Sequence, residues 1–491
     1  MGTRVEQVLN RIGGVARPSS DAATFERRDP ADQRQVVSVA PESTEQDVGD
    51  AVSAAVEAGP VWRRTTPSER SRLLRAAAEV LREQVGSLAE EMVREQGKPL
   101  AAARNEAGRT PDNLELYATE AFGIGGWTFP SDDPDARAYA VREPVGVVGV
   151  ITPWNFPLNL ASRKIGPALA AGNTVVFKPS PLTPLMGERL GAAFDLAGFP
   201  PGVVNVVHGS PAGRFLVGDE RVAAITFTGS TATGRAIQAA TPVGRRVQLE
   251  LGGNNPIVVL GDADLELAAQ VVRRSSFSLS GQACTGAGRV LVEASVHDEL
   301  LDRVVDLAAT EVVGPGLDPE TTMGPLVDER AIDDVDDAVR ATVDAGAKLA
   351  SGGYRLANAE ALKHGWYYPP TILEAVAHDA YVATHEVFGP VIGFEQVADL
   401  DEAIALANTT EYGLTAAICT RNPDAARRFA DEVEVGMLKI NRATVGAAIN
   451  LPFGGCKASG SGTHKEQFGP TVMDFYTRIR VVVEGAYGLA P

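Results

Sequence analysis

The feature that most restricts the fold is a repeated alternation of short apolar runs with helical patterns. Four runs rich in β-branched residues, each followed by a segment of helical periodicity, stand at 145–151, 174–177, 203–207 and 223–227. Strands that alternate with helices form βαβ units and a parallel sheet. The pattern therefore predicts an α/β fold in which ligands bind beyond the carboxyl ends of the strands.

A second alternating region follows the glycine pair Gly252-Gly253, with apolar runs at 257–260, 289–292 and 416–420. A chain of 491 residues exceeds the roughly 250–300 residues that one core supports, so we place a domain boundary at this pair. Two isolated β-branched runs, 138–142 and 479–483, fit neither region. We predict two open parallel-sheet, Rossmann-like domains and a small β-strand oligomerisation arm that pairs with another subunit.

Charge and cysteine usage exclude several classes of protein. With 63 acidic and 45 basic residues, the net charge of −18 disfavours nucleic acid and anionic membranes as partners. The first residues, 1–10, lack the apolar run of an export signal, and no stretch approaches the roughly 18 apolar residues of a membrane span. The isolated thiols Cys284, Cys419 and Cys456 cannot form a disulfide framework and show no metal-ligand spacing. We expect a cytoplasmic protein without a metal.

Two segments carry side chains suited to nucleophilic chemistry. Cys284 stands among small residues, in Gly281-Gln-Ala-Cys284-Thr-Gly-Ala-Gly288, which would let a substrate approach closely. A buried structural thiol explains it equally well. Asn155 follows a predicted strand in Thr152-Pro-Trp-Asn155-Phe-Pro157, where two prolines fix the turn. Its amide could stabilise a developing oxyanion, although a capping asparagine is the alternative.

Two further segments are ambiguous when each is taken alone. The run 226–234, with Gly229 and Ser230, follows a strand and opens a helix, a placement that presents backbone N–H groups to phosphate. It is not a GxGxxG fingerprint, and close packing of helix on strand would also explain it. Glu250 lies between two leucines and could have the raised pKa that a general base needs. The alternative is a solvated glutamate at a strand end.

Together these segments resemble the aldehyde dehydrogenase superfamily, and the resemblance runs from about residue 28 to residue 483. Eight ordered blocks carry it: Glu95-Gln-Gly-Lys-Pro99, Pro153-Trp-Asn-Phe-Pro157, Phe177-Lys-Pro-Ser180, Phe227-Thr-Gly-Ser230, Glu250-Leu-Gly-Gly253, Gly281-Gln-Ala-Cys284, Glu386-Val-Phe-Gly-Pro390 and Pro452-Phe-Gly-Gly455. The resemblance implies a dinucleotide-binding domain (1–136 and 144–252), a catalytic domain (253–455) and an arm with the C-terminal segment (137–143 and 456–491).

The resemblance also implies a mechanism. Cys284 would add to an aldehyde, Asn155 would stabilise the alkoxide, and Glu250 would activate the water that hydrolyses the thioester. The cofactor would be NAD or NADP without a metal, and the assembly a homodimer or homotetramer. The positions implied to contact the cofactor are Ile151, Thr152, Trp154, Lys178, Ser180, Arg214, Gly229, Ser230, Leu251, Glu386 and Phe388.

Departures from the family pattern bear on specificity. Pro181 stands where NAD-specific relatives often carry a glutamate that repels a 2′-phosphate, so use of both cofactors is our hypothesis. Arg163 stands where broad-specificity relatives have an aromatic residue and succinate-semialdehyde enzymes have arginine, which suggests a substrate with a carboxylate. Ser278 replaces the second arginine of those enzymes, which argues against succinate semialdehyde as the exact substrate. Phe156 and Phe453 would line the same aldehyde site.

Other readings remain open from the sequence. Arg163 could instead form a structural ion pair, and relatives with this arginine act on neutral hydroxy or aromatic aldehydes. A CoA-acylating enzyme is disfavoured by Glu250, which points to water as the acceptor. A catalytically silent structural protein on the same fold is disfavoured because Cys284, Asn155 and Glu250 occur together.

Overall fold

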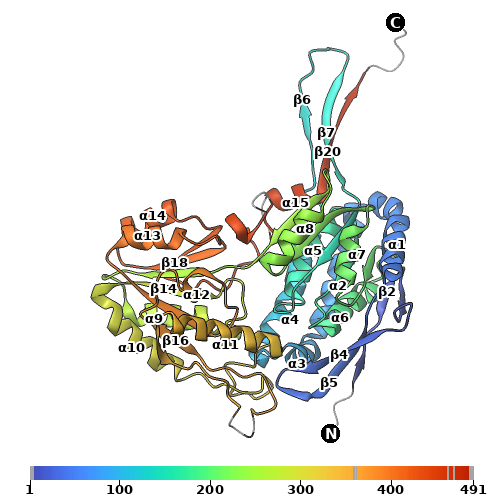
Figure 1. Cartoon of the computed structure of the whole chain (residues 1–491). Helices are drawn as coiled ribbons and strands as arrows, with labels where there is room; N and C mark the ends of the chain where they lie inside the picture. The colour runs from blue at the N-terminus through green and yellow to red at the C-terminus, as the bar shows by residue number, and fades with distance from the viewer. Residues whose placement is uncertain (1–4, 358–359, 361, 462–463, 468–469, 486–491) are drawn as a thin grey trace.

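Two large, mostly parallel sheets carry the two halves of the chain (Figure 1). The computed structural model describes residues 5–357, 360, 362–461, 464–467 and 470–485. Residues 1–4, on which the expectation of no export signal partly rests, and 486–491 of the C-terminal segment lie outside the described residues. Among the described residues, no helix is both long enough and apolar enough to cross a membrane.

The first sheet has seven strands, and its central strands form the predicted βαβ series. In sheet order these are β12 (Arg246–Glu250), β11 (Val222–Thr228), β8 (Val147–Ile151), β9 (Thr174–Lys178), β10 (Val204–Val206), β2 (Asn10–Ile12) and β3 (Val15–Arg17). The five strands from β12 to β10 are parallel, and β2 and β3 join antiparallel. The four sequence-predicted strands of this half are thereby confirmed.

Helices cover both faces of this sheet because successive strand residues point to opposite sides. Val148 and Val150 pack into one core with α2 to α6, whereas Val147 and Ile151 pack into another with α1, α7 and α8. The helices are α1 (Glu45–Arg64), α2 (Pro67–Glu83), α3 (Val85–Gln96), α4 (Leu100–Glu120), α5 (Asn159–Ala170), α6 (Pro184–Leu196), α7 (Ala212–Gly218) and α8 (Thr231–Ala240).

The second sheet begins four residues after the first one ends. In sheet order it contains β15 (Lys348–Ser351), β16 (Thr371–Glu374), β17 (Val391–Val397), β14 (Ala287–Glu293), β13 (Asn255–Val259), β18 (Thr415–Cys419) and β19 (Met437–Ile440). Only β15 is antiparallel to its neighbour. Its helices are α9 (Leu265–Phe277), α10 (His297–Ala308), α11 (Glu329–Asp344), α12 (Tyr381–Thr384), α13 (Leu400–Asn408) and α14 (Pro423–Glu432). The expected α/β class is confirmed.

The two isolated runs pair with each other and form an arm that projects away from both sheets (Figure 1). β7 (Arg137–Pro144) and β20 (Thr477–Glu484) are antiparallel neighbours along their whole length, and β6 (Trp127–Phe129) adds a third strand that the sequence analysis did not separate. α15 (Pro470–Tyr476) leads into β20. A further small sheet joins β1 (Glu6–Gln7), β5 (Asp32–Pro41) and β4 (Thr24–Asp29).

Candidate active site

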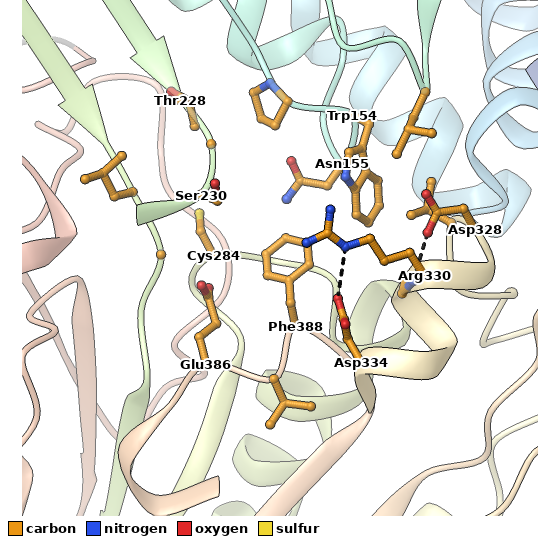
Figure 2. Close-up of a pocket in the computed structure, with 18 of the residues that line it drawn as sticks. Trp154, Asn155, Thr228, Ser230, Cys284, Asp328, Arg330, Asp334, Glu386 and Phe388 are labelled. Carbon is orange, nitrogen blue, oxygen red and sulfur yellow. Dashed lines mark hydrogen bonds and ion pairs between the residues drawn. The ribbon is translucent and has the colours of Figure 1, made fainter. Parts of the chain in front are cut away.

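Two pockets meet at Cys284. The larger one, which we call the Phe388 pocket, has a volume of about 380 Å³, and Trp154, Asn155, Ser230, Cys284, Glu386 and Phe388 are among its lining residues (Figure 2). The smaller one, the Arg163 pocket, has a volume of about 190 Å³, and Phe156, Arg163, Cys284 and Phe453 are among its lining residues. A thiol at this junction can contact one ligand from each side.

An unusual backbone holds the Cys284 loop. Leu279, Ser280 and Gly281 have consecutive positive φ angles of 55°, 56° and 70°, a conformation that two non-glycine residues in a row rarely adopt. Gly281 lies so close to the carbonyl oxygen of Gly389 that a Cβ atom would overlap it. The Cys284 loop and the Glu386–Pro390 block are therefore packed backbone against backbone.

Side-chain amides fix the same loop from both sides. The Gln282 Oε1 atom accepts a hydrogen bond of 2.9 Å from the Val327 backbone N–H. The Asn255 Nδ2 atom donates to the Cys284 carbonyl oxygen at 2.8 Å. Buried hydrogen bonds from side-chain amides restrict the position of the Cys284 thiol, so its geometry is fixed before a ligand binds.

Asn155 reaches the site as the sequence predicts, at the end of β8 and before α5. Its side chain is 2% exposed, and Nδ2 donates to the Gln282 carbonyl oxygen at 3.0 Å. An amide nitrogen carries two N–H groups, so the second can serve a ligand in the Phe388 pocket that Asn155 lines. The orientation of the amide is fixed further because Oδ1 accepts a bond of 3.1 Å from the Phe156 backbone N–H.

A buried ion pair behind this turn was not predicted. Lys98 and Glu106 lie 2.5 Å apart with side chains 1% and 2% exposed. The Lys98 ammonium also donates to the Asn155 carbonyl oxygen at 2.6 Å, while Glu106 accepts from the backbone N–H groups of Leu158 and Asn159. Lys98 belongs to a family-like block in the sequence, but nothing local to Glu106 shows that it meets the turn.

The charges near Cys284 disfavour its ionised form. Burial, followed by the charges of Glu386, Glu466 and Glu250, raises the pKa of the Cys284 thiol to about 12. Arg163 opposes this effect. The thiol is therefore neutral at physiological pH, and a change in these charges, or a cationic ligand beside the sulfur, would be needed to ionise it.

Glu250 lies close to the site but outside the lining of both pockets. Its carboxylate turns toward Gly454, where a Cβ atom would overlap Oε1, and Oε2 has no hydrogen-bond partner among the described residues. Burial raises the pKa of Glu250 well above its usual value, and the charge of Glu466 adds to the rise. The raised pKa agrees with the apolar neighbours that the sequence shows.

Lys164 and Glu466 are two further buried charged residues near Glu250, and neither was predicted from the sequence as a functional residue. Their side chains are fully buried, with Nζ and Oε2 3.4 Å apart. Lys164 lowers the pKa of Glu250 and Glu466 raises it. A signal for Lys164 existed, because two adjacent cations, Arg163 and Lys164, stand within the otherwise apolar α5.

The residues implied to contact a dinucleotide divide into two groups. Trp154, Gly229, Ser230, Leu251, Glu386 and Phe388 line the Phe388 pocket. The others, Ile151, Thr152, Lys178, Ser180 and Arg214, lie outside it. Ile151 pairs with Lys178 across neighbouring strands, and the Thr152 N–H donates to the Lys178 carbonyl oxygen at 3.3 Å. Arg214 lies on α7, whose residue Gly213 is next to the Lys178 side chain.

Lys178, outside the Phe388 pocket, and Glu386, inside it, both have shifted pKa values. Burial lowers the pKa of Lys178 to about 8 and raises the pKa of Glu386 to about 7. Glu386 accepts a bond of 3.0 Å from the Gly253 N–H, and a Cβ atom on Gly252 would overlap its carboxylate. The described residues hold no cluster of three or more histidine, cysteine or acidic side chains that could bind a metal ion.

Arg163 is the most informative side chain of the smaller pocket. It is 6% exposed, its Nε atom has no partner, and among the described residues it makes neither a hydrogen bond nor an ion pair. Its guanidinium lies 5.4 Å from the ring centroid of Phe453. A structural ion pair, the alternative raised by the sequence, is therefore absent among these residues.

Two further arginines line the Arg163 pocket and were not predicted. Arg109 comes from α4 and donates to the Ala447 carbonyl oxygen at 2.9 Å, whereas Arg274 comes from α9 and is exposed. Ser278, one helical turn after Arg274, donates to its carbonyl oxygen. Ser278 itself carries no guanidinium, but two arginines at neighbouring positions line the same pocket.

Comparison with known proteins gives one family throughout. The aldehyde dehydrogenase family model matches residues 17–482. An alpha-ketoglutarate semialdehyde dehydrogenase from Haloferax volcanii is 39% identical over 97% of this chain and 98% of its own. The crystal structure of an NAD-dependent aldehyde dehydrogenase from Sinorhizobium meliloti is similar with a TM-score of 0.94 at 35% identity, covering 99% and 96% of the two chains. The crystal structure of an NADP dependent enzyme from E. coli is similar with a TM-score of 0.93 at 34% identity, covering 98% of each chain.

Proposed function

This chain belongs to the aldehyde dehydrogenase family, and from that membership we propose that it oxidises a short semialdehyde bearing a carboxylate to the diacid, through a thioester on Cys284. The observation that carries the substrate class is the buried guanidinium of Arg163, which makes no hydrogen bond or ion pair among the described residues and lines a pocket that also reaches Cys284. A buried cation without an anion is costly, and a substrate carboxylate would complete it.

The cofactor in this proposal is NAD or NADP, bound across the Phe388 pocket. The residues fit such a group, because Gly252 leaves space at Glu386 and because Ser230, the N-cap of α8, lines this pocket and brings the positive end of the helix to it. Lys178, Ser180 and Arg214 would hold the adenosine end. Pro181 does not supply the acid that would repel a 2′-phosphate, although the charge of Glu42 acts on Lys178. When bound, such a group would supply the hydride acceptor that oxidation of the aldehyde carbon to the thioester level requires.

The chain's own residues supply the remaining chemistry. The Cys284 thiol loses its proton to water, the sulfur forms a bond to the aldehyde carbon, and the C=O π bond breaks so that the carbonyl oxygen becomes an alkoxide. The free N–H of Asn155 stabilises that oxygen by a charge-assisted hydrogen bond. The bonds of Asn155 to Gln282 and Phe156 keep the amide oriented before the charge develops.

Glu250 acts in the second half of the reaction. Its carboxylate takes a proton from water, the resulting hydroxide attacks the thioester carbon, and the carbon–sulfur bond breaks to release the acid and the Cys284 thiolate. To reach that water, the Glu250 side chain has to turn from Gly454 toward Cys284. This rotation would give up the hydrogen bond that the Gly455 N–H donates to the carboxylate, whereas Oε2 makes no hydrogen bond among the described residues.

The test of the substrate class compares acidic and neutral aldehydes of equal length. We expect kcat/KM for succinate and glutarate semialdehydes to exceed that for butanal and pentanal by about 10- to 150-fold, the range of one hydrogen-bonded charge. Arg163→Leu should abolish this preference by lowering only the acidic values. Arg163→Lys should keep part of it, because lysine retains the charge but not the bidentate fork.

Arg104→Leu is the matched control, since Arg104 is an exposed arginine of α4 outside both pockets. It should leave the ratio unchanged. Equal losses for acidic and neutral aldehydes in Arg163→Leu would reject the assignment of the substrate carboxylate to Arg163, while leaving aldehyde oxidation itself in place.

We also propose that the arm joins copies of the chain into a homodimer or homotetramer. β20 presents Ile479, Val481 and Val483 with exposed fractions of 57%, 64% and 67%. A row of exposed apolar side chains on a projecting strand is unfavourable in water and favours association. Val481→Glu should shift sedimentation toward smaller species, and an unchanged sedimentation profile would argue against this use of the arm.

A further inference from the structure

The charges that line the Phe388 pocket oppose the ligand proposed for it. Three carboxylates, those of Asp328, Asp334 and Glu386, line this pocket, and Arg330 is the one cationic side chain lining it among the described residues. A dinucleotide carries two negative charges on its pyrophosphate. Unless a cation meets them, the phosphates would enter a region of like charge.

Two of these carboxylates already have partners. Asp328 caps α11 by accepting a bond of 2.9 Å from the Ala331 N–H, and Glu386 accepts from the Gly253 N–H at 3.0 Å. Asp334, by contrast, contacts Arg330 through Oδ2 and Nε at 3.6 Å. This distance is too long for a hydrogen bond, so the ion pair is weak.

Arg330 is placed to change partners. It lies in the first turn of α11, its side chain is 88% exposed, and Figure 2 shows it extending into the space beside Trp154 and Phe388. The rings of Trp154 and Phe388 pack edge to face with centroids 5.6 Å apart, and both line the same pocket. A guanidinium here can contact a ligand that passes these rings on its way to Cys284.

We propose that Arg330 is a cofactor-binding residue that leaves Asp334 and binds the phosphate on the nicotinamide side of the dinucleotide. The proposal rests on the proposed function of the pocket. The planar guanidinium of arginine can donate two parallel hydrogen bonds to two oxygens of one phosphate. This interaction is stronger than the exposed ion pair of Arg330 with Asp334 at 3.6 Å. The phosphate on the adenosine side is left to the backbone N–H groups at the start of α8.

Asp334 then has a defined role as a competitor. In the free protein it holds Arg330 near the pocket, and in the complex it loses that partner. Removal of its charge should strengthen cofactor binding, whereas removal of Arg330 should weaken it. Opposite effects from two residues one helical turn apart would not follow from a general change in the stability of α11.

Ligand binding without catalysis tests the proposal by calorimetry. ADP-ribose contains the whole pyrophosphate, and AMP contains only the phosphate next to adenosine. We expect Arg330→Ala to weaken ADP-ribose binding by about tenfold and AMP binding by less than about twofold, since one charged hydrogen-bonding group is lost. Arg330→Lys should fall between wild type and Arg330→Ala, and Asp334→Asn should tighten ADP-ribose binding.

Arg340→Ala is the matched control, because Arg340 lies on the same helix, pairs with Asp336 and Asp337, and lies outside the pocket. It removes the same charge and should leave both affinities unchanged. Unchanged ADP-ribose binding in Arg330→Ala, or equal weakening of AMP, would overturn the role of Arg330 alone. Failure of the wild type to bind ADP-ribose would overturn the cofactor assignment and this proposal together.

Discussion

Two buried cations lie against aromatic rings of the Arg163 pocket, and they differ in how their charge is completed. The Lys98 ammonium lies 4.7 Å from the Phe156 ring centroid and pairs with Glu106 at 2.5 Å. The Arg163 guanidinium lies 5.4 Å from the Phe453 centroid and forms no contact ion pair among the described residues, although the charge of Glu466 acts on it from farther away. The contrast teaches that burial of a charge does not itself indicate function. A charge completed by the protein supports the fold, whereas one left incomplete indicates a ligand.

The largest effect should come from breaking the completed pair. Lys98→Met leaves Glu106 buried without its cation and should cost on the order of 3–5 kcal/mol of stability. Arg163→Leu removes an unpaired buried charge and should be neutral or stabilising. Melting temperatures should therefore fall for Lys98→Met and hold or rise for Arg163→Leu.

The double variant Lys98→Met with Glu106→Gln provides the control for this contrast. It removes the orphaned carboxylate and should recover part of the lost stability. If Lys98→Met and Arg163→Leu melted at the same temperature, the distinction between completed and incomplete charges would fail.

A second comparison separates chemistry from substrate recognition. Asn155→Ala should lower kcat by about 100- to 1,000-fold, the usual effect of removing one oxyanion donor. The loss should be the same for acidic and neutral aldehydes, because the donor faces the reacting oxygen that all aldehydes share. Rate measurements with succinate semialdehyde and butanal check this. A loss of kcat confined to one substrate class would indicate that Asn155 recognises the substrate and does not stabilise the reacting oxygen.

A smaller effect concerns the buried carboxylate Glu250. Because its pKa is raised, its basic form becomes scarcer as pH falls through that pKa, and hydrolysis of the thioester should slow about tenfold per pH unit below it. Glu466→Gln removes a charge that adds to this raised pKa, so the fall in hydrolysis rate should begin at a lower pH. Single-turnover hydrolysis rates measured across pH test the wild type and this variant, and Glu250→Gln should show no such fall in rate. Persistence of the fall in Glu250→Gln would assign it to another group.

Local patterns in the sequence predicted the parts of the molecule that depend on local structure. β-branched runs gave the positions of β8, β9, β11, β13 and β18 because buried parallel strands are apolar along their length. The strand β17 was not predicted, because a glycine and polar residues interrupt its apolar run. The turns that hold Cys284 and Asn155 are likewise short blocks with distinctive residues.

The parts that could not be predicted depend on contacts between distant segments. Glu106 meets Lys98 on one side and the turn after Asn155 on the other, and only the packing of α4 on α5 brings these together. Glu466 reaches Lys164 and Thr228 from the C-terminal segment. Arg330 and Asp334 enter the Phe388 pocket from α11, which no motif marks. The sequence indicates which groups react, and the fold determines which charges surround them.

The most direct measurement of the central claim is to locate the acyl group. Glu250→Gln, mixed rapidly with succinate semialdehyde and NAD and then quenched, should release about one equivalent of NADH per site and carry a succinyl group on the peptide that contains Cys284. Cys284→Ser should show neither. A burst with the acyl group on Cys419 or Cys456, or continued turnover by Cys284→Ser, would contradict the account.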